Sequence, residues 1–329
     1  MNDALPAAGA IRAWEDYVDR YPSGEATARV AYETGKLHER AGRASRARAM
    51  FTAATLAEPT SYFAMRAGEK LGVSALDPVL AEPRPWLGLA SDGEAAANVL
   101  RRLDALESVG LMEEWNAEYA AATRSLAKRP AALIALAEGV RDRGYPVPAI
   151  NLGWQLWEGR GRVWDARLLR VVFPFIYRDV LVREAERKGI SPFLLAGLVR
   201  QESSFRHDAR SRVSATGLCQ IMPSTGEWLA SSAGIRTFDR SLLEVPEINL
   251  RMGAEYLEDL LDRYHGAEDL ALAGYNAGPG RADRWRRQLP SRDRDAFREG
   301  IPFSETREYV KLVLRNAAVY ERLYGGRTN

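Results

Sequence analysis

Residues 191–211 read SPFLLAGLVRQESSFRHDARS and place Glu202 at the end of a predicted amphipathic helix. Ser191 followed by Pro192 predicts the start of this helix, because a hydroxyl caps the first turn and proline is tolerated at its first position. Glu202 lies one helical turn after Leu198 and therefore falls on the apolar stripe. A carboxyl group there loses water, which raises its pKa and suits a general acid that works near neutral pH.

The same position is also compatible with an ordinary surface charge. Glu202 could point to solvent, or it could pair with Arg206, which lies four residues further along the chain. The choice between these interpretations depends on what the rest of the chain supplies.

The segment after the helix reads DARSRVSATGLCQIMPSTGEWLA and predicts a tight turn followed by a second helix. Gly217 marks the turn, and we expect Ser224 to cap the new helix. Gln220 and Met222 lie close together before that helix. An amide that hydrogen-bonds hydroxyl groups, beside a thioether that packs on an apolar ring face, suits a sugar ligand.

A glycine-rich segment, ALAGYNAGPG at residues 271–280, presents Tyr275 and Asn276 at the predicted end of a helix. It is a weak candidate for a nucleotide loop, because no strand precedes it and no Lys-Ser/Thr pair follows it. The alternative to a binding role is that the glycine and proline residues simply end the helix.

One more helix is predicted in GIPFSETREYVKLVL, with Ser304 as its cap. Glu305 falls in its first turn, where the helix dipole alone favours an acid. A purely structural role for Glu305 is therefore open at this point.

The composition is that of an ordinary globular protein, with 329 residues, 46% hydrophobic and 27% charged. A formal net charge of +2 gives no broad basic surface for nucleic acid. The single cysteine, Cys219, excludes an internal disulfide. We expect no cofactor and no metal, because the three histidines are scattered without ligand spacing (His38, His207 and His265).

The sequence contains no run of apolar residues long enough for a transmembrane helix. Its start, MNDALPAAGAIRAW, has neither a basic region nor an apolar core, so no signal peptide is visible. Either the protein is cytosolic, or a leader has been removed from it.

Helical periodicity dominates the chain, and residues 28–59 have the order of one helix–turn–helix repeat. Small residues let two helices approach, an aromatic residue fills the gap, and a proline ends the second helix: Gly35, Gly42, Ala47, Phe51, Ala54 and Pro59. This spacing resembles a tetratricopeptide repeat, although any antiparallel hairpin favours small residues at its crossing.

A proline-rich break follows at residues 74–88, and helical hairpins are expected again at 92–126 and 130–158. We predict an all-α protein with two domains. Residues 1–170 would form a TPR-like superhelical stack of hairpins, and residues 171–329 a helical catalytic domain.

Four segments resemble the soluble lytic transglycosylase family, whose catalytic domain is lysozyme-like, and they occur in the family's order over about residues 190–320. They are RQESSFRHDARS with ATGLCQIMPSTG, then INLRMGAEYLEDLL, then ALAGYNAGPG, then IPFSETREYVKLVL. The helical arm looks like the superhelical domain of the larger members, although more loosely.

The resemblance implies roles for individual residues. Glu202 would be the single catalytic acid and base. The substrate-binding residues would be Ser203, Ser211, Gln220, Met222, Tyr275, Asn276 and Glu305.

Three departures from the family pattern bear on these roles. Cys219 replaces the usual methionine of the turn, Arg206 and His207 replace a common Asn-Pro, and Ser214 replaces a frequent glycine. Cys219 could change the packing or make the turn oxidisable, and the other two could alter the shape of the cleft.

The implied activity is cleavage of the β-1,4 bond between N-acetylmuramic acid and N-acetylglucosamine in peptidoglycan, without water, to leave a 1,6-anhydro sugar. The implied location is the periplasm or cell envelope, with peptidoglycan strands as substrate and room for a protein partner on the arm. Two alternatives stay open, a lysozyme-type muramidase that uses water and a non-catalytic peptidoglycan-binding scaffold.

Overall fold

The computed structural model describes residues 8–82, 84–290 and 293–326, and helices make up most of this part. It contains no strand, and its only β pairings are isolated bridges within residues 210–221. The predicted all-α class is therefore confirmed. The chain packs as two compact units.

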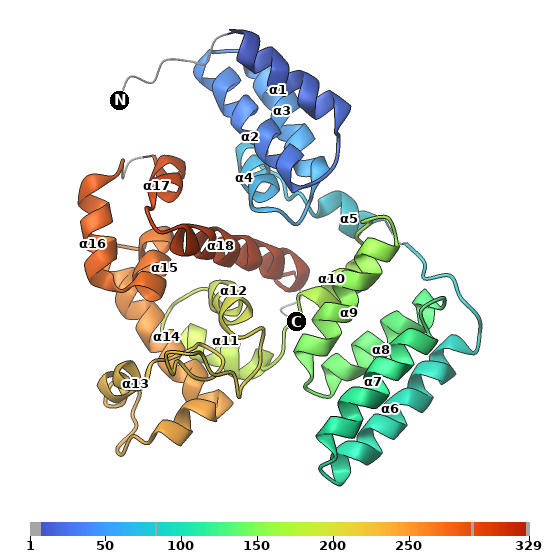
Figure 1. Cartoon of the computed structure of the whole chain (residues 1–329). Helices are drawn as coiled ribbons and strands as arrows, with labels where there is room; N and C mark the ends of the chain where they lie inside the picture. The colour runs from blue at the N-terminus through green and yellow to red at the C-terminus, as the bar shows by residue number, and fades with distance from the viewer. Residues whose placement is uncertain (1–7, 83, 291–292, 327–329) are drawn as a thin grey trace. The chain divides into compact units, whose positions relative to one another are not determined.

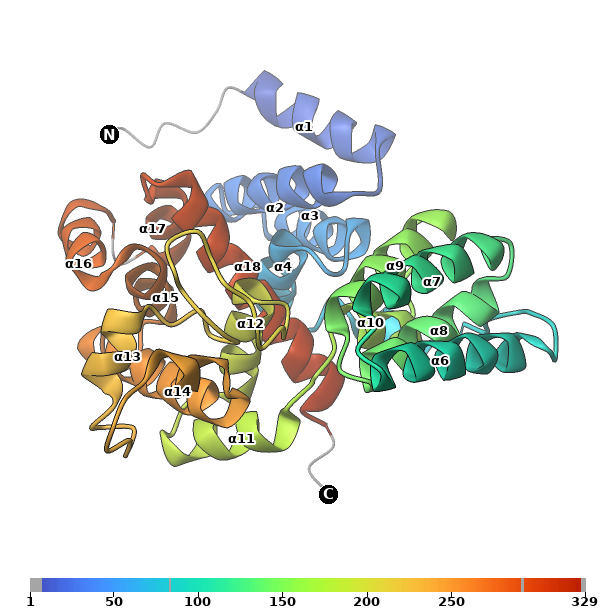
Figure 2. The ribbon, with the colours of Figure 1, turned by 60° about the horizontal axis from the view of Figure 1, so that its bottom comes forward.

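The first unit combines the N-terminal residues Met1–Glu82 with the C-terminal residues Leu272–Asn329. In the N-terminal part, α1 packs on α2, and α2, α3 and α4 pack on one another; Figure 2 shows these helices in blue. In the C-terminal part, α18 packs on α17 and on α4. The helices of this unit are α1 (Ala8–Arg20), α2 (Glu25–Arg40), α3 (Ala44–Ala57), α4 (Tyr62–Leu71), α5 (Asp77–Ala81), α16 (Pro279–Gln288), α17 (Arg294–Gly300) and α18 (Ser304–Tyr324).

The close approach of α2 and α3 rests on Gly35. A methyl group added at Gly35 would lie 2.5 Å from the Phe51 ring, so the glycine makes room for the aromatic side chain. Phe51 is 4% exposed and packs against Tyr32 as well. Gly42 forms the turn between the two helices with a φ of 69°. The helical hairpin predicted at residues 28–59 is thus confirmed.

The second unit is the continuous segment Pro83–Ala271. Helices α6 to α10 lie side by side in green in Figures 1 and 2, where they form a stack of hairpins. Helix α14 packs on α11, α12 and α13 in the remainder of the unit. The elements are α6 (Asp92–Ser108), α7 (Met112–Ser125), α8 (Pro130–Asp142), α9 (Pro146–Gly159), α10 (Ala166–Val172), α11 (Arg178–Arg187), α12 (Pro192–Glu202), α13 (Pro223–Leu229), the 3-10 helix η1 (Arg240–Glu244) and α14 (Pro246–Arg263). Helix α15 (Glu268–Ala277) begins in this unit and ends in the first one.

Both hairpins predicted in this part of the chain are confirmed. Helices α6 and α7 occupy the predicted segment 92–126, and α8 and α9 occupy 130–158. The proline-rich break at 74–88 contains the short helix α5, which the sequence did not indicate. The domain boundary near residue 170 stays a prediction.

Across the described ranges, none of the helices combines the length and apolar character that crossing a membrane would need.

Candidate functional site

Helix α12 carries Glu202 as its last residue. The predicted start is confirmed, since the Ser191 hydroxyl accepts a hydrogen bond of 3.3 Å from the Leu194 N–H and Pro192 is the first helical residue. Residues 194–199 are all buried, so the helix lies inside the unit on nearly every side. Glu202 is half-buried, which places its carboxyl group at the edge of this core.

The backbone directly after Glu202 adopts an unusual conformation. Ser204 and Phe205 have φ values of 53° and 65°, in the left-handed region that residues with a side chain seldom adopt. Phe205 is 1% exposed, so its buried ring holds this conformation in place. The Arg200 guanidinium donates a 2.8 Å hydrogen bond to the Ser204 hydroxyl. Strain of this kind is concentrated at functional sites, where it fixes the position of a reacting group.

The segment 209–221 folds into a closed turn beside α12. The Gly217 N–H donates to the Ala209 carbonyl at 2.8 Å. Thr216 and Ile221 exchange backbone hydrogen bonds of 3.0 and 3.1 Å. Gly217 has a φ of 82°, as expected for a glycine required by a tight turn.

Asn249 on α14 holds this turn from behind, and the sequence interpretation missed it. Its side-chain N–H groups donate to the carbonyls of Thr216 at 3.0 Å and Leu243 at 2.7 Å. Its Oδ1 accepts a 2.7 Å bond from the Cys219 N–H. The residue is completely buried. An amide on the apolar stripe of a predicted helix was the signal that could have revealed it.

Two predicted substrate-binding residues use their donors within the turn. The Ser203 hydroxyl donates to the Leu218 carbonyl at 2.9 Å, which ties the turn to the end of α12. The Gln220 side-chain nitrogen donates to the carbonyls of Ala209 at 3.0 Å and Gly217 at 2.9 Å. For Gln220, this leaves Oε1 as the side-chain atom that could accept a hydrogen bond from a ligand.

Ser211 and Met222 lie at the two margins of the turn. The Ser211 hydroxyl accepts a 2.9 Å bond from the Ala215 N–H and so closes the loop 211–215. Met222 is 37% exposed and precedes α13, which leaves its thioether accessible.

The hydroxyl caps predicted for the two later helices, Ser224 and Ser304, are wrong. Helix α13 begins at Pro223 with Met222 as its N-cap, so Ser224 is already inside the helix. Helix α18 begins at Ser304 with Phe303 as its N-cap. In both cases the chain enters the helix one or two residues earlier than the hydroxyl suggested.

The remaining candidates belong to the other compact unit, where one hydrogen bond connects two of their segments. The Thr306 hydroxyl, which is 2% exposed, donates to Asn276 Oδ1 at 2.7 Å. Asn276 and its neighbour Tyr275 are half-buried at the end of α15. Glu305 precedes Thr306 in the first turn of α18 and is exposed. The structure therefore groups Glu202, Ser203, Ser211, Gln220 and Met222 in one unit, and Tyr275, Asn276 and Glu305 in the other.

Arg206 and Asp208 form an exposed ion pair at 3.4 Å, with side chains 54% and 65% exposed. Arg206 therefore directs its charge to Asp208, on the solvent side of the turn. His207, between them, is exposed as well. These departures from the family pattern thus lie on the surface of the unit.

The Cys219 thiol is completely buried, and its pKa is raised by burial and then by the negative charge of Glu202. A thiolate is the reactive form of cysteine. We therefore expect Ellman's reagent to label the native protein far more slowly than the protein unfolded in guanidinium. Rapid labelling of the native protein would contradict this burial and would restore the idea of an oxidisable turn.

Gly217→Ala should destabilise the protein strongly. A methyl group there would lie 2.2 Å from both the Leu243 carbonyl oxygen and the Asn249 amide nitrogen. The backbone strain costs roughly 1–2 kcal/mol, and the steric conflict adds about 1–3 kcal/mol. Gly234→Ala is the matched control, because Gly234 has a similar φ of 74° with nothing within 4 Å. Urea unfolding of both variants separates the backbone strain from the steric conflict. Equal losses in free energy of unfolding would show that the contact with Asn249 is unimportant.

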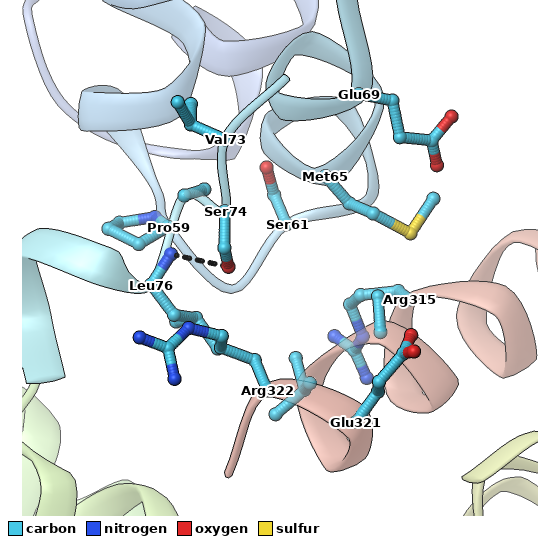
Figure 3. A pocket seen from close by; sticks show the side chains of 13 residues that line it. Pro59, Ser61, Met65, Glu69, Val73, Ser74, Leu76, Arg315, Glu321 and Arg322 are labelled. Atoms are coloured by element: carbon cyan, nitrogen blue, oxygen red, sulfur yellow. Dashed lines mark hydrogen bonds between the residues drawn. The ribbon is translucent and has the colours of Figure 1, made fainter. Parts of the chain in front are cut away.

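A cavity of about 410 Å³ lies in the first unit, between the α4 region and α18. Figure 3 shows Met65 and Arg315 facing it from these two sides. Arg322 also lines it but forms an ion pair with Asp77 at 2.6 Å. None of the candidate catalytic or substrate-binding residues lines this cavity.

Comparison with known families gives two matches. Residues 179–297 match the family described as Transglycosylase SLT domain, and residues 300–329 match the family described as Soluble lytic transglycosylase helical domain. The first match contains Glu202 and the whole turn 209–221, and it includes residues of both compact units.

Individual relatives are similar over part of their length. The soluble lytic murein transglycosylase of Salmonella typhimurium is 39% identical over 168 residues, which are 50% of this chain and 26% of that protein. The lytic transglycosylase Slt of Pseudomonas aeruginosa, solved as an inactive Glu-to-Gln mutant, has 31% identity and a TM-score of 0.73 over 90% of this chain and 46% of its own. The 70 kDa soluble lytic transglycosylase of Escherichia coli has 26% identity and a TM-score of 0.74, over 96% and 49%. The chain thus matches half or less of the length of each of these relatives.

Proposed function

We propose that the chain is a peptidoglycan lytic transglycosylase with Glu202 as its catalytic acid and base, because residues 179–297 match the family described as Transglycosylase SLT domain. The observation that carries the proposal is the half-buried Glu202 at the end of the buried helix α12, inside the matched region. The inactive Glu-to-Gln mutant of the Pseudomonas relative supports the assignment of catalysis to a glutamate.

The reaction that we propose uses one carboxyl group twice. Glu202 gives its proton to the glycosidic oxygen as the bond from C1 of N-acetylmuramic acid to that oxygen breaks. The 2-acetamido group of the same sugar stabilises the cationic centre as an oxazolinium. The Glu202 carboxylate then removes the proton from the C6 hydroxyl. The C6 oxygen bonds to C1 as the bond from C1 to the acetamido oxygen breaks, which forms the 1,6-anhydro ring and restores the acetamido group. Glu202 ends protonated, and no water is consumed.

A single acid is sufficient because the substrate supplies both the stabilising group and the nucleophile. Hydrolases that use two carboxyl groups need the second one as a nucleophile or to activate water. Asp208, the acid that follows Glu202 most closely, is 65% exposed and ion-paired with Arg206, which makes it a poor second catalyst.

The turn 209–221 would supply part of the glycan site. Gln220 Oε1 can accept a hydrogen bond from a sugar hydroxyl or amide, and the exposed Met222 thioether can pack on a ring face. Ser203 and Ser211 would act mainly through the shape of the turn, since their hydroxyls are bonded to its backbone.

Tyr275, Asn276 and Glu305 are assigned to substrate through the family's Tyr-Asn pair and Glu-Thr-Arg segment. The partly buried hydrogen bond from Thr306 to Asn276 supports this assignment in part, because it holds the Asn276 amide against the start of α18. Tyr275 would orient the reacting sugar, and Glu305 would lie at the edge of the site.

The substrate sets the location, because peptidoglycan lies outside the cytoplasmic membrane. We accordingly place the enzyme in the periplasm or cell envelope. A protein partner on the hairpin stack is compatible with this location.

Mass spectrometry of the products of purified sacculi tests the proposed reaction. We expect muropeptides that end in 1,6-anhydro-N-acetylmuramic acid, each 18 Da (about one water) lighter than its hydrolysed counterpart. Reducing ends would identify a lysozyme-type hydrolase instead. Binding to sacculi without any released product would identify a scaffold.

A further inference from the structure

Two adjoining cavities of about 370 and 320 Å³ open between helices α7 and α9 of the hairpin stack. Thr123, Leu152 and Gln155 line both of them, so the two cavities form one continuous groove. The Tyr119 hydroxyl donates a 3.0 Å hydrogen bond to the Pro148 carbonyl and holds the two helices together at one end. The lining residues run from Val147 on α9 to Arg160, the residue that follows this helix, over a length of about 20 Å.

The groove has an apolar floor and a polar wall. Leu133, Leu152 and Leu156 line it and are 7%, 2% and 5% exposed. Asn151 and Gln155 line it from the exposed side of α9. Neither of their amides makes a side-chain hydrogen bond within residues 8–82, 84–290 and 293–326, so both are available to a ligand.

The spacing of these amides fits an extended peptide. Residues four apart on a helix lie about 6 Å apart along its axis, and alternate residues of an extended chain lie about 6.6–6.8 Å apart. Each amide carries a donor and an acceptor and can bond to a backbone N–H and C=O. The intervening side chains of the peptide would then point to the leucine floor.

The charges at the groove give the ligand a direction. Lys128 and Arg160 line the larger cavity, whereas the smaller one is lined by uncharged side chains. Arg160 is held in place by a 2.6 Å ion pair with Asp165 and by the Trp86 ring at 3.8 Å. Lys128 is exposed and has no acidic partner in the part of the chain that the structure describes. This end of the groove therefore favours a carboxylate.

We propose that this groove binds the extended C-terminal segment of a partner protein, with its terminal carboxylate at Lys128 and alternate apolar side chains on the leucine floor. A groove about 20 Å long holds about six residues of an extended chain. None of the side chains lining either cavity, all of them described, is acidic, so the groove offers no partner for an ammonium group. This argues for a protein terminus and against the amine-bearing peptides of peptidoglycan. The proposal is independent of the catalytic reaction.

Affinity selection from a randomised hexapeptide library with free C-terminal carboxylates tests the proposal on the full chain. We expect enrichment of peptides with apolar residues at alternate positions, and at least tenfold weaker binding of the same peptides when their C-termini are amidated. Lys128→Glu should weaken binding at least tenfold, because it reverses the charge that meets the carboxylate. Gln155→Trp should abolish binding, because it fills both cavities from an exposed position.

Two matched variants control for charge and for bulk. Arg101→Glu reverses an exposed charge on α6, and Asn116→Trp replaces an exposed amide on α7, both at positions that line neither cavity. Both should bind the selected peptides as the unaltered chain does. The proposal is overturned if nothing is enriched relative to Gln155→Trp, if amidation has no effect, or if peptidoglycan peptides bind more tightly than the selected ones.

Discussion

We expect Glu202→Gln to leave the chain folded but to stop peptidoglycan cleavage, with turnover reduced by at least about 10³-fold. Glutamine has the same shape as glutamate but can neither give a proton to the glycosidic oxygen nor remove one from the C6 hydroxyl. A general acid or base contributes about 10²–10⁴-fold to one step, and in the proposed reaction one group serves both steps. Release of soluble muropeptides from purified sacculi measures the loss, and thermal unfolding reports on the fold.

Glu227→Gln is the matched control for this variant. Glu227 lies on α13 within the same compact unit and is exposed, so its charge is expected to matter little. That variant should keep its activity to within about twofold, a free-energy change of about 0.4 kcal/mol. Turnover by Glu202→Gln close to that of Glu227→Gln would remove Glu202 from the mechanism and leave the site without its acid.

The sequence predicted those parts of the fold that depend on neighbouring residues. The α2–α3 hairpin followed from the small Gly35 opposite the aromatic Phe51, and the start of α12 followed from Ser191 and Pro192. The helical spacing of apolar residues and the prolines at helix ends are local properties of the sequence. Tertiary packing seldom overrides them in long helices.

Features that depend on distant residues could not be predicted in this way. Asn249 holds the turn 209–221 from a helix about thirty residues further along the chain, and the Gln220 side-chain nitrogen bonds the turn's own backbone. The grouping of residues 1–82 with 272–329 in one compact unit is equally non-local. Hydrogen-bond partners at such separations leave no periodic signal in a single sequence.

A mostly buried ionic cluster around Asp295 joins these two segments of the first unit. The Tyr32 hydroxyl donates to Asp295 Oδ2 at 2.6 Å across 263 residues of sequence. Arg66 donates to Oδ1 at 3.0 Å, and Lys36 lies 3.7 Å from Oδ2. The side chains of Asp295, Arg66 and Lys36 are only 11%, 17% and 14% exposed. Solvent therefore screens the cluster little.

Asp295→Asn should be the most destabilising of the substitutions that keep side-chain shape, at about 3–5 kcal/mol. Removing the carboxylate leaves Arg66 and Lys36, which are mostly buried, without their common partner. Among the described residues, each then has only a more exposed glutamate beside it, Glu69 for Arg66 and Glu33 for Lys36. A buried ion pair can add little stability compared with apolar residues in its place. Removing only one of the two charged partners, however, costs a large amount of stability. Urea unfolding near pH 7 measures this cost. Asp142→Asn is the control, because Asp142 is 62% exposed in its pair with Arg141, and it should change stability by less than about 1 kcal/mol.

The same cluster fixes the direction of the pH dependence. Burial alone would raise the pKa of Asp295, but the hydrogen bond from Tyr32 and the charges of Arg66 and Lys36 lower it below its usual value. The folded state thus binds this proton less readily than the unfolded state, whose aspartates titrate near about 3.9. The stabilisation is present above that value and is lost as the pH falls through the lower pKa of the folded state. The difference in free energy of unfolding between the unaltered chain and Asp295→Asn should accordingly be constant from pH 7 to about pH 5. It should shrink below about pH 4. A difference that grew on acidification would mean that Asp295 is protonated in the folded protein, and the cluster would then have to hold its two segments together by some means other than charge.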